Sequence, residues 1–184
     1  MITTSHHAKT VFEQTRVQVK DQNGQTHDNY ALQKPVEVVN YPVNKHEASP
    51  EGLDIPFETT KNFLCVAQWG PRKNLENTIS WFIDEFKDDE DVGLVLKTNT
   101  MSDSVKDREF TTQRLEGLLK NTSADRKCKI YLVHGEISSG QLAWLYEHPT
   151  MKAMINIAHG EGYGLPLFEA AIHGLPLVTV TWSG

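Results

Sequence analysis

The sequence predicts an α/β domain with a doubly wound parallel sheet, and three observations carry this prediction. From residue 62 onward, short apolar runs of strand length alternate with helical stretches. The run 92–97 is apolar almost throughout, which is typical of a strand that is covered on both faces. Strands that alternate with helices at this spacing indicate right-handed βαβ units, which build a parallel sheet.

The elements of this domain follow in order along the chain. In the first helix, apolar side chains recur from Leu75 to Phe86 at the spacing of one helical face. Asn74 is the expected N-cap of this helix, and Phe110 is expected on the apolar face of the next one. The expected strands are 63–68, 92–97, 129–133, 153–157 and 177–181, and the expected helices are 75–86, 106–120, 141–147 and 166–173.

The first part of the chain has a different pattern. "MITTSHHAKTVF" predicts the end of a strand and then a helix from Ser5 to about Phe12. The pair Asn23-Gly24 predicts a turn, which fits a hairpin whose first strand is 17–19. A further short strand is expected at 36–40.

Composition and charge limit the classes of function. The chain has 184 residues, of which 39% are hydrophobic and 23% are charged, as in a soluble globular protein. A net charge of −6 argues against nucleic acid as the main partner. No apolar run reaches the ~18 residues of a membrane span, and the N-terminus lacks the apolar core of a signal peptide. Cys65 and Cys128 are expected to be buried thiols in a reducing compartment, with a disulfide or a metal pair as the alternative.

The most informative stretch is "HGEGYGLPLFEAAIHGLPLV", which begins at His159. Its closely spaced glycines, Gly160, Gly162 and Gly164, let the backbone turn sharply and approach a ligand, since they carry no Cβ. Pro166 suits the first position of a helix. The free N–H groups of that helix then lie at the carboxyl edge of the sheet, where doubly wound folds bind nucleotides and helix N-termini favour anions.

Two carboxylates lie close to this predicted anion site. Because a carboxylate repels a phosphate, these two side chains are expected to bind a different group of the ligand. Glu161 lies in the loop and Glu169 lies near the start of the helix. An ionised carboxylate accepts two hydrogen bonds at once, and the vicinal diol of a ribose or a hexose supplies two donors. A nucleotide sugar carries a ribose, a diphosphate and a sugar, so it matches the whole stretch. Arg72 and Lys73, in "GPRKN", supply cations for the diphosphate at the same edge.

These segments resemble a known family. "EGYGLPLFEA" followed by "GLPLV" resembles the Glu-x7-Glu motif of the group 1 (family 4) glycosyltransferases, which are retaining enzymes of the GT-B fold. "VAQWGPRKNLENTISWF" resembles the strand, loop and helix that carry the family's phosphate-binding lysine, and "SSGQLAWLY" with "MINIAHGEGYG" resembles the entry into the motif. The resemblance covers roughly residues 62–184 and implies the Rossmann-like, C-terminal half of a GT-B fold, apparently truncated.

The resemblance also implies a role for each matching residue. Lys73 would hold the diphosphate, with Arg72 beside it. Glu161 would hold hydroxyls of the donor sugar, and Glu169 would hold the ribose. Many members of the family place an arginine near Gln68, and here that cation is absent. The backbone expected to meet the sugar and the phosphate is that of Gly162, Tyr163, Gly164 and Leu165.

By the same resemblance, residues 1–40 are a remnant of the N-terminal acceptor domain, 41–61 are a connection, and 62–184 are a donor domain that is incomplete at its end. The expected activity is sugar transfer with retention, from a nucleotide-diphosphate sugar to a glycan, a lipid-linked acceptor or a protein. No cofactor and no metal are expected. The chain alone, without the acceptor domain, is expected to be inactive. The expected location is the cytoplasm, or the surface of a membrane for the full-length protein. A non-catalytic nucleotide-sugar-binding module or an epimerase-like protein is the alternative.

Several other residues leave two interpretations open. "DDED" at 88–91 resembles an Asp-x-Asp metal motif, but it is expected on the opposite edge of the sheet, where a solvated acidic turn fits better. His134 follows a strand on the ligand side, so it either lines the cleft or acts as a loop or cap histidine. Asn99 and Lys97 end another strand and are candidate donor contacts. The tryptophans expected to serve packing rather than ligand binding are Trp69, Trp81 and Trp144.

Overall fold

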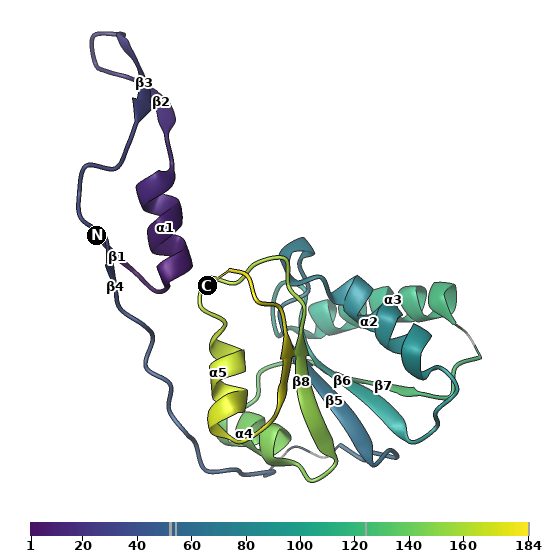
Figure 1. Ribbon diagram of the computed structural model, residues 1–184. Coiled ribbons are helices and arrows are strands. Elements are labelled where there is room, and N and C mark those ends of the chain that lie inside the picture. The colour runs from purple at the N-terminus through teal and green to yellow at the C-terminus, as the bar shows by residue number, and fades with distance from the viewer. Residues whose placement is uncertain (52, 54, 124, 184) are drawn as a thin grey trace. The chain divides into compact units, whose positions relative to one another are not determined.

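The computed structural model describes every residue of the chain except 52, 54, 124 and 184 (Figure 1). The described residues form two compact units. The first unit comprises Met1–Pro42, Gly160–Leu165 and Thr181–Gly184, and the second comprises Val43–His159 and Pro166–Val180. Each unit is described in turn.

The second unit is built on a five-stranded parallel sheet in the order β7-β6-β5-β8-β9 (Figure 1). Its strands are β5 (Lys61–Val66), β6 (Val92–Lys97), β7 (Lys129–Val133), β8 (Met151–Asn156) and β9 (Leu177–Thr179). The chain starts at the centre, builds outward through β6 and β7, and then returns to the other side of β5 for β8 and β9. This order confirms the doubly wound fold, with its switch point between β5 and β8.

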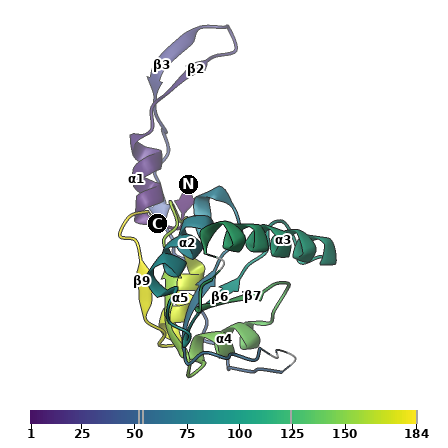
Figure 2. The same ribbon diagram turned by 90° about the vertical axis from the view of Figure 1, so that its right-hand side faces the viewer.

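Helices cover both faces of this sheet (Figure 1 and Figure 2). They are α2 (Leu75–Phe86), α3 (Val105–Thr122), α4 (Ser139–Glu147) and α5 (Leu165–Ile172). Side chains alternate across a strand, so Cys65 packs in the core under α2 and α3, while its neighbour Leu64 packs under α4 and α5. In the same way Leu94 and Leu96 face the first core, and Val95 faces the second. The sheet is therefore buried on both sides.

The element boundaries differ from the prediction by a few residues. β5 begins at Lys61 rather than at residue 63, and its last residue is Val66. Helix α3 begins at Val105, after Ser104, whose hydroxyl accepts the backbone N–H of Asp107 at 3.2 Å. Asn74 does precede α2, but its φ is 56° and its side chain does not cap the helix, because a 3-10 turn, η1 (Pro71–Lys73), leads into it.

Two predictions about packing, for Phe110 and Trp81, are wrong, whereas the burial of both cysteines is confirmed. Phe110 is 54% exposed, because the face of α3 that packs on the core contains Leu115 but not Phe110. Trp81 is 57% exposed and belongs to neither hydrophobic core. Cys65 and Cys128 are both buried and do not form a disulfide, as the sequence predicts. No helix within the described residues is both long enough and apolar enough to cross a membrane.

The first unit contains two small sheets and one helix. Ser5 caps the helix α1 (His6–Gln14) by accepting the backbone N–H of Ala8 at 3.1 Å. The predicted hairpin is present, and Gly24, with a φ of 80°, occupies its turn. The strands are β1 (Ile2–Thr3) and β4 (Glu37–Val38), which pair in parallel, and β2 (Val17–Lys20) and β3 (Thr26–Tyr30), which form the hairpin.

A buried polar network fixes the amino end of the central strand. Thr59 donates its hydroxyl to Asn62 Oδ1 at 2.6 Å and lies 3.1 Å from the hydroxyl of Tyr131. Asn62 Nδ2 in turn donates to the hydroxyl of Thr150 at 2.9 Å. Gly93 lies directly against this network. A Cβ on Gly93 would fall 2.7 Å from Tyr131 Cε2 and 2.8 Å from Thr59 Oγ1.

We therefore expect Gly93→Ala to lower the free energy of unfolding by about 1–3 kcal/mol, because the added methyl overpacks a network that has no room. Gly117→Ala is the matched control. Gly117 lies inside α3, and apart from its chain neighbours and the backbone of its own helix no described atom lies within 4 Å of its Cβ position, so alanine there should stabilise the chain by roughly 0.5–1 kcal/mol. Urea denaturation measures both variants, and equal effects of the same sign would contradict the packing argument.

Candidate functional site

The carboxyl edge of the sheet in the second unit contains a cavity of about 390 Å³, here called the edge cavity. Residues after β5, β6 and β7 line it together with the first turn of α5. These are Val66, Ala67, Gln68, Lys73, Lys97, Thr98, Asn99, Asp103, Glu136, Ile137, Leu142 and Pro166. The edge cavity thus lies at the carboxyl ends of the strands, the part of a doubly wound sheet where ligands bind.

Lys73 reaches the edge cavity from the turn η1. The backbone of this turn is fixed from two directions, since the N–H of Lys73 donates to the carbonyl of Gly70 at 3.0 Å and the carbonyl of Arg72 accepts the N–H of His159 at 2.8 Å. Arg72, by contrast, is not among the described residues that line the cavity. The structure therefore brings Lys73 together with Pro166 but leaves Arg72 outside.

Hydrogen bonds join the loops around the edge cavity. Lys97 Nζ donates to the carbonyl of Gly135 at 2.7 Å, and burial lowers the pKa of Lys97, a shift that Asp103 opposes. Asn99 lines the cavity and donates its amide to Asp103 Oδ1 at 3.1 Å. Gln68 donates its amide to the carbonyl of Thr100 at 3.2 Å. The cavity wall is therefore polar and carries both positively and negatively charged side chains.

His134 does not line the edge cavity but supports one of its loops. Its side chain is 3% exposed, and its Nε2 lies 2.9 Å from Asp107 Oδ2, whose side chain is 6% exposed. Asp107 also accepts the backbone N–H groups of Thr100 and Met101, at 3.0 and 2.9 Å. The pair therefore ties the end of β7 to the loop that follows β6.

The role of Asp107 was not predicted, although the sequence contains a signal for it. Ser104 followed three residues later by an acidic residue is the pattern of a capping box at a helix start. Burial of Asp107 opposes its ionisation, but the hydrogen bonds from His134 and from the backbone of Thr100 and Met101 outweigh it. They hold the pKa of Asp107 at about 2.

Glu169 lies on α5 and lines a separate, small cavity of about 20 Å³. The buried hydroxyl of Tyr146 donates to Glu169 Oε2 at 3.3 Å. Burial raises the pKa of Tyr146, and the negative charge of Glu169 raises it further. Leu142 of α4 lines both this cavity and the edge cavity, so the two cavities are neighbours, but Glu169 does not line the space that Lys73 lines.

The glycine-rich loop belongs to the first unit and is described with it. The backbone N–H of Glu161 donates to the hydroxyl of Ser183 at 2.9 Å. The carbonyl of Gly162 accepts the hydroxyl of Thr4 at 3.3 Å. The loop is therefore hydrogen-bonded to both the start and the end of the chain.

Further along this loop, Tyr163 donates its hydroxyl to the carbonyl of Tyr41 at 3.2 Å, and the two rings meet edge to face at 5.5 Å. Gly164 has a φ of 78°, a left-handed conformation that favours glycine immediately before the helix. Leu165 then begins α5. The loop thus turns at the glycine that the sequence predicts for a close backbone approach.

The acidic run 88–91 lies at the amino end of β6, as the sequence predicts. Asp91 accepts the backbone N–H of Thr60 at 2.7 Å and its hydroxyl at 2.6 Å, and Lys61 Nζ lies 3.7 Å away. Asp91 therefore joins two strands at the edge opposite the edge cavity. The part of the chain that the structure describes contains no group of three or more His, Cys, Asp or Glu side chains able to hold a metal ion.

The sequence matches no protein-family model and no curated protein, but its fold is similar to solved glycosyltransferases. The C-terminal domain of a glycosyl transferase group 1 family protein (LpcC) from Francisella tularensis matches with a TM-score of 0.52 and 18% identity. That match covers 66% of this chain and 58% of that domain. An α,α-trehalose-phosphate synthase from Burkholderia xenovorans, in complex with glucose-6-phosphate, matches with a TM-score of 0.62 and 13% identity, over 99% of this chain and 46% of that one.

A third structure, described as trehalose-6-phosphate from E. coli bound with UDP-2-fluoro glucose, matches with a TM-score of 0.58 and 9% identity. The match covers 99% of this chain and 46% of that one. This chain therefore spans about half the length of the structures that it resembles. At these identities the likeness concerns the fold: an α/β sheet of the Rossmann-like type found in the C-terminal domain of GT-B glycosyltransferases.

The Asp107 carboxylate makes stability depend on pH in a defined window. Because its folded pKa of about 2 lies below the ordinary value of 3.8, it contributes stability above about pH 4 and loses that contribution as the pH falls through 2. We expect Asp107→Asn to be less stable than the wild type at neutral pH, with a difference that shrinks between pH 4 and pH 2. Urea midpoints across this range measure it. Asp84→Asn, an exposed change on α2, is the control, and a difference for Asp107→Asn that stays constant with pH would contradict the assignment.

Proposed function

We propose that this chain is the donor-binding part of a glycosyltransferase that moves a sugar from a nucleotide-diphosphate sugar to an acceptor, with retention and without a metal. The observation that carries the proposal is the edge cavity, where Lys73 and Pro166, which lies in the first turn of α5, line one space at the carboxyl edge of a doubly wound sheet. A lysine and a helix N-terminus facing the same space form an anion site.

The proposed chemistry is electrostatic. As the sugar leaves, negative charge grows on the nucleoside diphosphate, and groups that are already fixed in place stabilise that charge best. Lys73 is mounted on a turn held from two directions, and Lys97 lines the same cavity. The chain's own residues thus supply the positive charge, so the proposal requires no metal ion for this step.

Recognition of the two sugars is assigned to the two glutamates. In this proposal Glu169 accepts hydrogen bonds from the ribose, and Tyr146 orients its carboxylate by donating to one oxygen. Glu161, at the turn of the glycine-rich loop, accepts hydroxyls of the donor sugar, and the loop backbone approaches the sugar and the phosphate. The acceptor is assigned to a further domain, since the chain spans about half the length of the similar structures.

The alternative is a module that binds a nucleotide sugar without transferring it, or an epimerase-like protein. The absence of an arginine near Gln68 favours this alternative, because many members of the family that the sequence resembles place that cation there, where it would help to neutralise the leaving diphosphate. Asp103 and Glu136 also line the edge cavity and reduce its positive charge. Turnover of a nucleotide sugar by a longer form of the protein that includes an acceptor domain supports the transferase. Tight binding without turnover supports the module.

Lys73→Ala should lower the affinity for a nucleoside diphosphate about 10- to 100-fold, because one charge-assisted hydrogen bond is lost. The affinity for the uncharged nucleoside should hardly change. Calorimetric titration with both ligands measures this, with the exposed Lys106→Ala as the control. If Lys73→Ala leaves the diphosphate affinity unaltered, Lys73 is not part of the site. A large gain in wild-type affinity on adding Mn²⁺ would overturn the metal-free mechanism.

Glu169→Ala should weaken binding of the free nucleoside diphosphate and of the nucleotide sugar alike, by roughly 1.5–3 kcal/mol, since both contain the ribose. Glu161→Ala should weaken only the nucleotide sugar, because only that ligand carries the donor sugar. The same calorimetry separates the two effects. Equal losses for both variants on the free nucleoside diphosphate would contradict this division of the diols.

A further inference from the structure

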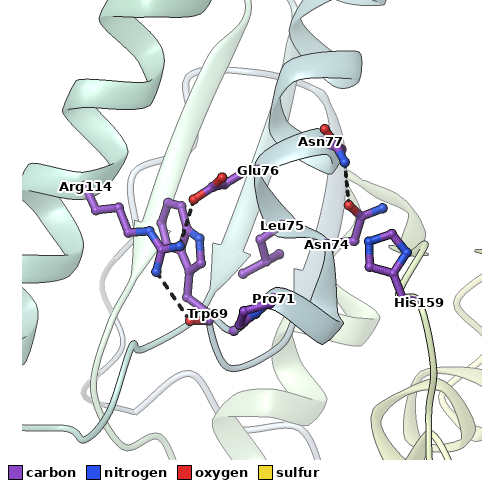
Figure 3. A pocket seen from close by; sticks show the side chains of 9 residues that line it. Trp69, Pro71, Asn74, Leu75, Glu76, Asn77, Arg114 and His159 are labelled. Atoms are coloured by element: carbon purple, nitrogen blue, oxygen red, sulfur yellow. Dashed lines mark hydrogen bonds and ion pairs between the residues drawn. The ribbon is translucent and has the colours of Figure 1, made fainter.

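A second cavity of the second unit lies beside Trp69 and has a volume of about 250 Å³ (Figure 3). Trp69, Glu76 and Arg114 form one side of it, and Asn77 and His159 form the other (Figure 3). It is lined by none of the residues that line the edge cavity. We call it the Trp69 cavity, and the proposed function makes no use of it.

The first observation that points to a ligand is an unpaired donor. Trp69 is 3% exposed, and its indole N–H has no hydrogen-bond partner among the described residues. Buried polar groups in folded proteins almost always have a partner, so an unpaired one that lines a cavity indicates a site for an acceptor atom. The ligand must therefore present an oxygen or nitrogen with a lone pair to the indole.

The second observation concerns charge. Arg114 Nη2 lies 2.7 Å from Glu76 Oε1, and its guanidinium also stacks over the Trp69 ring at 4.7 Å (Figure 3). The one arginine and the one carboxylate of the cavity therefore neutralise each other. No lysine and no second carboxylate is among the described lining residues. A site of this kind favours a neutral ligand over a phosphate or a cation.

The remaining lining groups define the chemical class of that neutral ligand. Asn77 carries an amide, whose nitrogen donates to Asn74 Oδ1 at 2.7 Å, and Glu76 carries an acceptor. A hydroxyl both donates and accepts, so a polyhydroxylated ligand can serve the indole, the carboxylate and the amide together. Pro71 and Leu75 provide apolar surface for the C–H groups of a ring. The volume is that of a small ligand rather than of a nucleotide.

We propose that the Trp69 cavity binds a neutral sugar, one ring of a saccharide or a similar polyol, at a site separate from the edge cavity. The turn η1 forms a wall of each cavity, since Pro71 lines one and Lys73 lines the other. The neutral sugar and the charged ligand of the edge cavity thus bind on the two sides of one turn. This site stands independently of the transferase reaction, because its residues, its charge and its ligand class are different.

The test follows the indole N–H signals of the 184-residue chain by ¹H–¹⁵N NMR while methyl α-glucopyranoside is added. The chain has four tryptophans, and Trp69→Phe identifies the signal of Trp69. We expect that signal to move progressively with a Kd of about 1 mM, as a ligand of this size permits. The exposed Trp81 is the internal control, and its signal should stay in place.

Asn77→Ala is the variant that tests the site without risk to the fold, because Asn77 is exposed at the first turn of α2. It should weaken sugar binding about 2- to 10-fold, the effect of one lost hydrogen bond, and leave nucleoside diphosphate binding unchanged. Tetrahydropyran-2-methanol, which lacks the ring hydroxyls, should bind more weakly than the sugar.

Three results would overturn the proposal. One is a Trp69 signal that stays in place at about 100 mM sugar, a hundredfold above the expected Kd. Another is a signal that responds to inorganic phosphate but not to sugar, which would mark an anion site. The third is unchanged sugar affinity in Asn77→Ala. If nucleoside diphosphate does not bind but the Trp69 signal still responds to sugar, the proposed function fails and the sugar site is supported.

Discussion

The central position of β5 is the constraint on which the rest of the second unit depends. β5 pairs in parallel with β6 on one edge and with β8 on the other. A parallel pair requires a crossover connection, and right-handed crossovers on the two sides of β5 cover opposite faces of the sheet. The connections that leave the carboxyl ends of β5 and β8 therefore diverge, and this divergence opens the edge where Lys73 and Pro166 line one cavity.

The two ends of the central strands are secured by buried polar groups of different kinds. At the amino end, Thr59 bonds to both Asn62 and Tyr131 through its hydroxyl, and these are amide and hydroxyl groups without charge. At the carboxyl end, the ionised Asp107 accepts backbone N–H groups of the loop after β6. A charge-assisted contact holds a loop more firmly than a neutral one, and it also makes that loop sensitive to acid. Among the buried groups, neutral hydrogen bonds thus secure the amino end, and an ionised carboxylate secures the carboxyl edge.

Local patterns in the sequence predicted the elements well and the contacts between them poorly. The strand 92–97 and the helix from Leu75 were predicted because their hydrophobic periodicity is a local property. The same periodicity argues against Trp81 in the core, since it falls two residues after Ile79 and off that helical face. The pairing of His134 with Asp107 joins residues from different elements, and no local pattern reveals such a contact. Lys73 and Asn99 both line the edge cavity, and their position at this edge was predictable because each follows a strand that ends there.

Contacts with the end of β8 fix the turn η1, which carries Lys73. Pro71 fixes the backbone where the turn begins, and Asn74 ends it in a left-handed conformation. The Asn74 amide donates to the carbonyl of Ile157 at 3.1 Å, and the carbonyl of Arg72 accepts the N–H of His159. Asn74 therefore joins the loop after β5 to the end of β8 in place of capping α2. A helix cap stabilises one element, whereas this contact spans the switch point and sets the position of Lys73 relative to both strands. The side chain that breaks the local capping rule thus connects the loops that follow β5 and β8.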